Sequence, residues 1–372
     1  MVNADHLSGM EISEADKIKV CDLLLKFPGV ARVRLSRTAA GQLAAQVLGW
    51  DRPMISPDSG PLTELAHHNP DELQFLHDEI FLGESYLQGG ITLREKAVVF
   101  DVGANIGVFS LFVHARCPSA EVYAFEPIPD IYDQLRRNVE RHGAGARLFP
   151  CGLSDHDREV SFNFYPDLSI MSCRSDYADL ENESKLVTRY VENARENGPE
   201  DRHEHLSRVE SLVTRDFDLS ERRCRLRRLS EVIDETGVDR IDLLKVDVQR
   251  SELDVLKGID AGHWPLVHQV VMEVHDEVGT PTEGRLQEVC TLLLEHGFRV
   301  SDAETDLLRG AGRFTVQAIR PAYAGDPRSV VARAGSTEAL DPCALRDWLA
   351  GRLPGHLMPQ EITMVDALPP TD

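Results

Sequence analysis

The sequence predicts an α/β fold built on a doubly wound, parallel sheet. Residues 97–102 form an apolar, β-branched run that breaks at Gly103 and resumes with apolar residues at helical spacing over 106–113, which indicates strand, turn and helix. A second apolar strand, residues 120–125, follows and ends in an acid, Glu126. Strands that alternate with helices in this way favour a parallel sheet with crossover helices.

The glycine turn predicts a nucleoside cofactor other than NAD. Its spacing is G-x-x-x-G, whereas a dinucleotide pyrophosphate calls for G-x-G-x-x-G. Gly103 and Gly107 lack a Cβ, so main-chain N–H groups at the helix start can meet a ligand carboxylate or a ribose edge. Glu126 follows at roughly the 20-residue distance from which a carboxylate reaches a ribose diol. Together with Asp101 it suits a cofactor with ribose hydroxyls and a cationic, phosphate-free end, which is S-adenosylmethionine.

Three motifs in order carry a family resemblance. They are residues 101–107 (DVGANIG), residues 125–127 (FEP), and residues 241–247 (IDLLKVD) followed by residues 252–258 (ELDVLKG). This set resembles the FkbM-type methyltransferases, particularly those embedded in polyketide and nonribosomal peptide synthases, over residues 70–320. The resemblance implies a class I, Rossmann-like methyltransferase that uses S-adenosylmethionine. The alternative is an unrelated nucleotide-binding α/β domain.

The end of this region fits the same fold. Residues 285–297 predict an amphipathic helix that ends at a glycine, followed by strands around 298–300 and 314–319. A terminal antiparallel hairpin of this kind is typical of class I methyltransferases.

Composition limits the possible partners. The 372 residues carry a net charge of -22, which disfavours nucleic acid and anionic membranes, because binding to phosphates depends on Lys and Arg. The seven cysteines are scattered and never paired as C-x-x-C, so neither a disulfide framework nor a zinc site is expected. The start lacks the features of a signal peptide and no apolar run has the length of a membrane span, so we expect a cytoplasmic protein.

The two ends of the chain resemble pieces of a second domain. Residues 330–372 are similar to the closing segment of an adenylation domain of peptide synthases, and residues 1–50 to the segment just before it. We therefore expect a small split α+β subdomain, interrupted by a linker at 51–70 and the methyltransferase at 71–322. The large adenylating portion is missing, which favours a scaffold role for these flanks. The alternative is a leader helix and a tail.

Cofactor contacts are expected from four places. In the family the segment 71–90 lies over the cofactor, so Tyr86 is a candidate contact, although a packing tyrosine is an equal alternative. Residues 151–155 follow a strand at the point where class I methyltransferases hold the adenine ring, so Asp155 is a candidate acceptor for the adenine amino group; a turn-forming aspartate is the alternative. The full set of expected cofactor residues is Tyr86, Asp101, Gly103, Asn105, Gly107, Glu126, Ser154 and Asp155.

The acceptor is expected under an insertion. Residues 166–218 interrupt the strand-helix alternation with a polar, largely helical segment, which predicts a lid; a disordered loop is the alternative. The expected acceptor contacts are Met171, Ser172, Tyr177, Tyr190 and Gln249. The arginine-rich run 221–229 invites interpretation as a docking patch for an acidic carrier protein, but a strand with solvated arginines is favoured.

The strand 241–247 ends in a carboxylate at the edge of the sheet where such folds bind ligands. The FkbM pattern usually continues Asp-x-Glu-Gly-x-Glu, whereas this chain has Asp247-Val-Gln249-Arg250-Ser-Glu252. The loss of one carboxylate weakens the case for a metal, and none is expected.

The next strand, 267–275, supplies a candidate base. Alternation puts Glu273 and His275 on one side at the strand end, near Asp247. Methyl transfer requires the acceptor to be aligned and deprotonated, and imidazole suits that task. We predict His275 as general base, Asp247 and Glu273 as its supports and Lys245 as the cation that neutralises the buried acids. A structural, hydrogen-bonded histidine is the alternative.

The resemblance implies O-methylation of a hydroxyl or enol on a polyketide or peptide intermediate tethered to an acyl or peptidyl carrier protein, beside neighbouring synthase domains. One alternative is N-methylation of an aminoacyl or peptidyl thioester. The other is a non-catalytic docking module that keeps the fold for architecture only.

Overall fold

The computed structural model describes most of the chain. The described residues are 13–25, 30–38, 42–49, 65–178, 193, 219–304, 309–325, 330–333, 345–346, 349–350, 352–354 and 357–365. Within these ranges none of the helices is long and apolar enough to cross a membrane.

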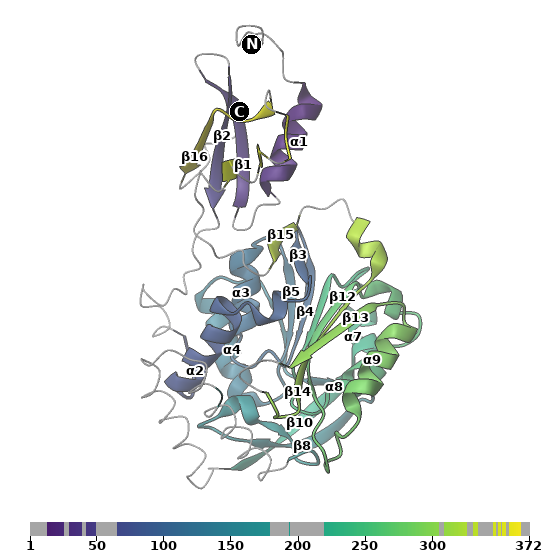
Figure 1. Ribbon diagram of the computed structural model, residues 1–372. Helices are drawn as coiled ribbons and strands as arrows, with labels where there is room; N and C mark the ends of the chain where they lie inside the picture. The colour runs from purple at the N-terminus through teal and green to yellow at the C-terminus, as the bar shows by residue number, and fades with distance from the viewer. Residues whose placement is uncertain are drawn as a thin grey trace.

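A seven-stranded sheet organises the molecule and confirms the predicted α/β fold (Figure 1). Its order is β13-β14-β12-β11-β4-β5-β6, with β14 antiparallel to both neighbours and β12, β11, β4, β5 and β6 parallel. The terminal antiparallel hairpin was predicted. The strands are β4 (Val98–Val102), β5 (Glu121–Phe125), β6 (Arg147–Phe149), β11 (Leu243–Val246), β12 (Gln269–His275), β13 (Arg299–Glu304) and β14 (Arg313–Ile319).

Helices cover both faces of this sheet because its central strands are apolar on both sides. In β4, Val99 joins a core with Leu135, whereas Phe100 joins a separate core with Leu256 and Val289. Figure 1 shows α3 and α4 on one face and α7, α8 and α9 on the other. The helices are α3 (Val108–Arg116), α4 (Pro129–Arg141), α7 (Leu229–Thr236), α8 (Glu252–Lys257) and α9 (Arg285–Glu295), with short 3-10 turns η8 (Trp264–Leu266) and η10 (Pro321–Gly325).

A second sheet lies next in the chain, ordered β7-β10-β8-β9. Its strands are β7 (Gly152–Ser154), β8 (Arg158–Phe164), β9 (Cys173–Arg174) and β10 (Ser220–Arg228), and η6 (Ser169–Met171) precedes β9. Most of the predicted lid, residues 179–192 and 194–218 with Tyr190 among them, lies outside the described residues.

The arginine-rich run forms β10, as predicted. Cys224 and Leu226 are buried, and the arginines pair with carboxylates instead of forming an open basic patch. Examples are Arg222 with Asp130 at 2.7 Å, and Arg225 with Asp157 at 2.7 Å. With their charges locally neutralised, these arginines do not favour an acidic carrier.

The segment before β4 is irregular, with three short helical elements in place of one helix. α2 (Pro70–His77) begins at Asn69, whose side chain accepts the Asp71 N–H, and continues as a π-helix, η4 (Asp78–Leu82). The 3-10 turn η5 (Ser85–Leu87) and β3 (Thr92–Arg94) follow. β15 (Val330–Arg333) pairs with β3, so residues 330–333 belong with this region and not, as expected, with the C-terminal piece.

Both ends of the chain contribute to one small sheet. β2 (Leu43–Gly49) pairs antiparallel with β1 (Val30–Arg37) and parallel with β16 (Glu361–Val365). α1 (Glu14–Leu25) joins the same core, which contains Val20, Val47, Leu349 and Ile362. The adenylation-like character of this unit and the boundaries at 50, 70 and 322 stay predictions.

Candidate active site

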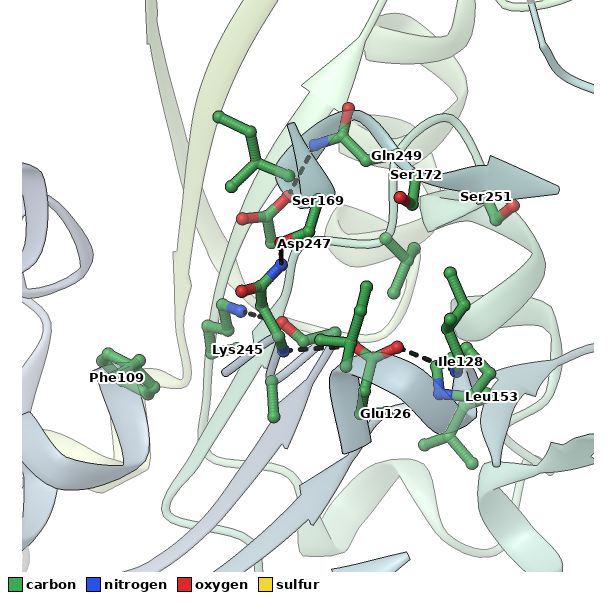
Figure 2. A pocket seen from close by; sticks show the side chains of 18 of the residues that line it. Phe109, Glu126, Ile128, Leu153, Ser169, Ser172, Lys245, Asp247, Gln249 and Ser251 are labelled. Carbon is green, nitrogen blue, oxygen red and sulfur yellow. Dashed lines mark hydrogen bonds between the residues drawn. The ribbon is translucent and has the colours of Figure 1, made fainter. Parts of the chain in front are cut away.

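A cleft opens at the carboxyl ends of β4 and β11, where ligands bind in doubly wound sheets. Its wall combines an apolar end with two polar groups of residues (Figure 2). The apolar end is formed by Ile128, Leu153, Phe162 and Leu226. An apolar slot of this kind suits a planar, weakly polar ring system.

Glu126 lies beside the apolar end and has lone pairs to spare. Its Oε1 accepts the Ile128 N–H at 2.9 Å and its Oε2 accepts the Asn105 N–H at 3.1 Å. A carboxylate has about four acceptor sites, so each oxygen keeps one for a ligand hydroxyl. Burial raises the pKa of Glu126 to about 7, although the two N–H groups oppose this shift.

The main-chain N–H groups of the glycine turn bond to the protein itself and not to a ligand. The N–H groups of residues 103–107 are all bonded internally: those of Gly103 and Ala104 to the Phe125 carbonyl, that of Asn105 to Glu126, and the next two to Asn105 and Ala104. The expectation that they hold a ligand carboxylate is therefore wrong. They instead pin the turn to β5.

A positive φ favours glycine at both positions of the turn. Gly103 has φ +75°, and a Cβ there would also collide with the Asp247 carbonyl oxygen. Gly107 has φ +92°, and its nearest neighbour is the end of the Leu135 side chain on α4. Gly103 lines the cleft, but Gly107 does not. Gly107 therefore shapes the turn and does not lie in the cleft where a cofactor contact was expected.

Asp101 and Lys245 form a buried ion pair beneath the cleft. Lys245 Nζ lies 3.2 Å from Asp101 Oδ1 and donates to the Gly103 carbonyl at 2.7 Å. Burial alone would lower the pKa of Lys245, but Asp101 and Asp247 raise it above its ordinary value. Lys245 reaches the cleft wall, whereas Asp101 is fully buried and accepts the Ser110 hydroxyl at 2.7 Å. Asp101 therefore anchors the lysine and does not contact a ligand directly, contrary to expectation.

Asp247 is the carboxylate that faces the cleft together with Tyr86. The Tyr86 hydroxyl donates to Asp247 Oδ2 at 2.8 Å, and Gln249 Nε2 donates to Oδ1 at 3.3 Å. Burial, with Asp247 adding to it, raises the pKa of Tyr86, so the phenol stays a donor. All three residues line the cleft, and their expected roles stay predictions.

His275 lies behind this wall, not in it. Its side chain is fully buried, with Nδ1 2.7 Å from Glu252 Oε1 and Nε2 3.2 Å from Gln249 Oε1. Burial and the nearby Arg313 and Arg250 hold the pKa of His275 well below its ordinary value. The imidazole does not face the acceptor as predicted, because Gln249 stands between it and the cleft.

Glu273 is also outside the cleft wall. Its Oε1 lies 3.3 Å from Arg313 Nη1 and 3.8 Å from His275 Nε2. Burial and the charge of Asp247 raise the pKa of Glu273 to about 7. It belongs to the same charge network as His275.

Sequence reasoning missed Glu79. Burial, then the charges of Glu273 and Asp247, raise the pKa of Glu79 to about 8. The residue lies in the π-helix η4, and π-helical turns occur frequently at functional sites. The sequence carries a weak signal, since Glu79 falls in the segment 71–90 that the resemblance places over the cofactor.

Ser154 and Asp155 lie off the cleft, while their neighbours Gly152 and Leu153 line it. Ser154 is buried and donates to Asp155 at 3.0 Å, and Asp155 pairs with His156 at 2.9 Å, which fits the turn alternative.

Some of the expected acceptor contacts line the cleft and others do not. Ser172 lines the cleft, whereas Met171 is buried beside it and Tyr177 packs against Arg174 and Arg285. Ser251 lines the same side, and its buried hydroxyl finds no hydrogen-bond partner within the described chain (Figure 2).

These features fit S-adenosylmethionine. The cleft combines an apolar end, which suits a ring, with the free acceptor sites of Glu126, which suit a diol, and with the Asp247 carboxylate, which suits a cation. No group of three or more potential metal-ligating side chains comes together in the described ranges.

Comparison with known proteins gives the family. Residues 101–300 match the family model described as the methyltransferase FkbM domain. The chain is 39% identical over 259 residues to the 31-O-demethyl-FK506 methyltransferase FkbM of Streptomyces tacrolimicus, covering 69% of this chain and 94% of that protein. It is 41% identical over 318 residues to the AMB antimetabolite synthetase AmbE of Pseudomonas aeruginosa, which covers 82% of this chain but only 15% of AmbE.

Solved structures are more distant. The precorrin-6y C5,15-methyltransferase of Geobacter metallireducens aligns with a TM-score of 0.33 at 12% identity, over 64% of this chain and 85% of that one. The fold assignment therefore rests on the sheet order and the family match. The chain belongs to the FkbM methyltransferase family and is an S-adenosylmethionine-dependent methyltransferase.

Proposed function

We propose that the protein methylates an oxygen, a hydroxyl or enol, on a polyketide or peptide intermediate held by a carrier protein in natural-product assembly. The observation that carries the proposal is the Asp247 carboxylate in the cleft wall, held from two sides by Tyr86 and Gln249. The printed names of the relatives support the setting, because one acts on an O-demethyl substrate and the other is a synthetase.

The cofactor is proposed to lie along the cleft. Ile128, Leu153, Phe162 and Leu226 would hold the adenine, and Glu126 the ribose diol. Tyr86 and Asn105 would lie toward the methionine end. S-adenosylmethionine, when bound, supplies a methyl group on a positively charged sulfur.

Asp247 is proposed to take the acceptor's proton. A hydroxyl is a poor nucleophile until its proton leaves, and the remaining task of the protein is to align the acceptor and exclude water. Tyr86 and Gln249 each occupy one lone pair of the carboxylate, so both of its oxygens keep a site for an incoming hydroxyl. Lys245 compensates the local negative charge.

The acceptor is proposed to enter on the side of Ser172 and Ser251. The unpartnered, buried Ser251 hydroxyl would gain a partner when a polar acceptor binds, since a buried hydroxyl without one costs free energy. Gln249 lies at the same end of the cleft (Figure 2).

Intact-protein mass spectrometry tests the proposal. The full chain is incubated with S-adenosylmethionine and carrier proteins loaded with matched hydroxyacyl or aminoacyl groups. We expect one methyl to be added to the hydroxyacyl carrier, whereas methylation of the aminoacyl carrier alone would assign the enzyme to nitrogen. Cofactor binding without transfer to either would favour the docking-module alternative.

Asp247→Asn is the key variant for this test. It keeps the size of the side chain but removes the carboxylate that accepts the proton, so we expect transfer to fall about 100-fold or more. Cofactor affinity measured by calorimetry should change only a few-fold. Asp239→Asn, at a carboxylate 88% exposed, is the matched control and should transfer like the parent protein.

A further inference from the structure

Gln249 is held by three side chains at once. Its Nε2 donates to Asp247 Oδ1 at 3.3 Å, its Oε1 accepts from Arg313 Nη1 at 3.2 Å, and the same oxygen lies 3.2 Å from His275 Nε2. The residue thus connects the cleft carboxylate to the buried charges behind it.

The orientation of this amide is fixed by chemistry. Arg313 can only donate, so the oxygen of Gln249 faces the guanidinium and its NH₂ group faces the Asp247 carboxylate. The reverse orientation would place donor against donor and acceptor against acceptor. The amide therefore has a single orientation, in which its NH₂ group donates to Asp247.

The backbone at this position is strained and clamped. Gln249 has φ +47° and Arg250 has φ +69°, a left-handed region that costs non-glycine residues free energy. Arg250 compensates through two hydrogen bonds of 3.1 Å to Glu277. Arg285 also donates to the Arg250 carbonyl, which fixes the loop further.

The charge of the side chain at this position matters as well. A glutamate in place of Gln249 would bring a second carboxylate to about 3.3 Å from Asp247 in a half-buried site, where like charges resist joint ionisation. The glutamine avoids that repulsion.

We infer that Gln249 is a positioning residue: its amide, oriented by Arg313, holds the Asp247 carboxylate in a fixed orientation toward the cleft. The inference deepens the proposed function and rests on it for the role of Asp247. The charged or titratable groups around this pair come from six elements and are Glu79, Tyr86, Lys245, Glu252, Glu273, His275 and Arg313.

Gln249→Glu tests the inference through activity. Two carboxylates in contact titrate as a pair, so the acid limb of the kcat/KM profile for the hydroxyacyl carrier should move upward by about one pH unit or more. Gln249→Met removes the amide without adding charge and should lower kcat about tenfold while leaving the acid limb in place. Gln287→Glu, on the exposed face of α9, is the charge-matched control and should leave the profile unchanged.

A second measurement needs no substrate. When burial raises the pKa of an acid, the folded protein becomes less stable as the pH rises. The loss occurs between the pKa of the acid in the unfolded state and its higher pKa in the folded state. The melting temperature of Gln249→Glu, relative to the parent, should therefore fall between pH 5 and pH 8, whereas that of Gln287→Glu should not.

The kcat/KM profile and the melting profile together distinguish failure of the proposed function from failure of the positioning role. If the parent protein methylates neither carrier, the proposed function fails and the melting profile alone decides whether the carboxylates interact. If Gln249→Glu shows parental pH dependence in the melting profile, or in the kcat/KM profile of an active parent, the positioning role is overturned.

Discussion

The two sides of the cleft are built in opposite ways. On the Glu126 side, positive φ angles fall at Gly103, Asn105 and Gly107, and the hydrogen bonds join residues of neighbouring strands and turns. On the Asp247 side, positive φ angles fall at Gln249 and Arg250, and the contacts come from distant parts of the chain. The first side follows local backbone rules, whereas the second is assembled by buried side chains that compensate strain and charge.

The largest expected effect tests the backbone rule on the first side. In Gly103→Ala the new Cβ would collide with the Asp247 carbonyl in addition to the cost of a positive φ, so we expect the free energy of unfolding to fall by about 4 kcal/mol or more. Denaturant titration measures this change. Gly143→Ala is the matched control, because Gly143 has φ +64° and nothing within 4 Å of the added atom.

The control should lose only about 1 kcal/mol. Equal losses in both variants would mean that the turn is limited by its dihedral angle alone and that the two sides of the cleft are not in contact through Gly103.

The next effect concerns the pH dependence of Glu126. Its folded pKa of about 7 lies above that of an unfolded glutamate, so its burial costs stability as the pH rises from roughly 4 to 7. Glu126→Gln removes this cost, and we expect the variant to gain about 2 kcal/mol relative to the parent between pH 5 and pH 8.

Thermal unfolding of both proteins at the two pH values measures the gain. Glu121→Gln, exposed at the start of the same strand, should show no such change. A parallel pH dependence of Glu126→Gln and the parent would show that Glu126 is ionised without cost. Cofactor affinity of Glu126→Gln should nevertheless drop, since one acceptor of the ribose diol is lost.

The smallest effect is expected on the second side, at Glu79. With a pKa of about 8, this residue is largely protonated at pH 7, so Glu79→Gln should retain methyl transfer within about threefold there. Above pH 8 the parent gains a charge near Asp247 and the variant does not, so their rates should diverge. Glu95→Gln, at an exposed residue, should follow the parent throughout. Rates that stay parallel up to pH 9 would place Glu79 outside the electrostatics of the cleft.

This contrast explains which parts of the fold and of the cleft can be predicted from the sequence. The α/β fold, the strand ends and the residues Glu126, Lys245 and Asp247 follow from local periodicity and motif spacing, and the structure has them at the cleft. His275 was placed correctly on its strand but not with respect to the cleft. Alternation shows which face a side chain takes; it does not show that Gln249 stands in front of it.

Other features had no local signal. The π-helix that carries Glu79 looks like an ordinary helix in the sequence, and the closed hydrogen bonding of residues 103–107 depends on where β5 ends. The pairing of Arg313 with Gln249 joins residues of different strands and loops, which no short motif encodes.

The pairing of β2 with β16 has a consequence for synthesis on the ribosome. β2 ends at Gly49 and its parallel partner begins at Glu361, so this edge of β2 stays unpaired until the intervening residues have emerged. Non-local pairing of this kind is slow, and an unpaired strand edge invites aggregation in the interval. The strands of the seven-stranded sheet, which all lie between these two strands in the sequence, emerge before β2 and β16 can pair.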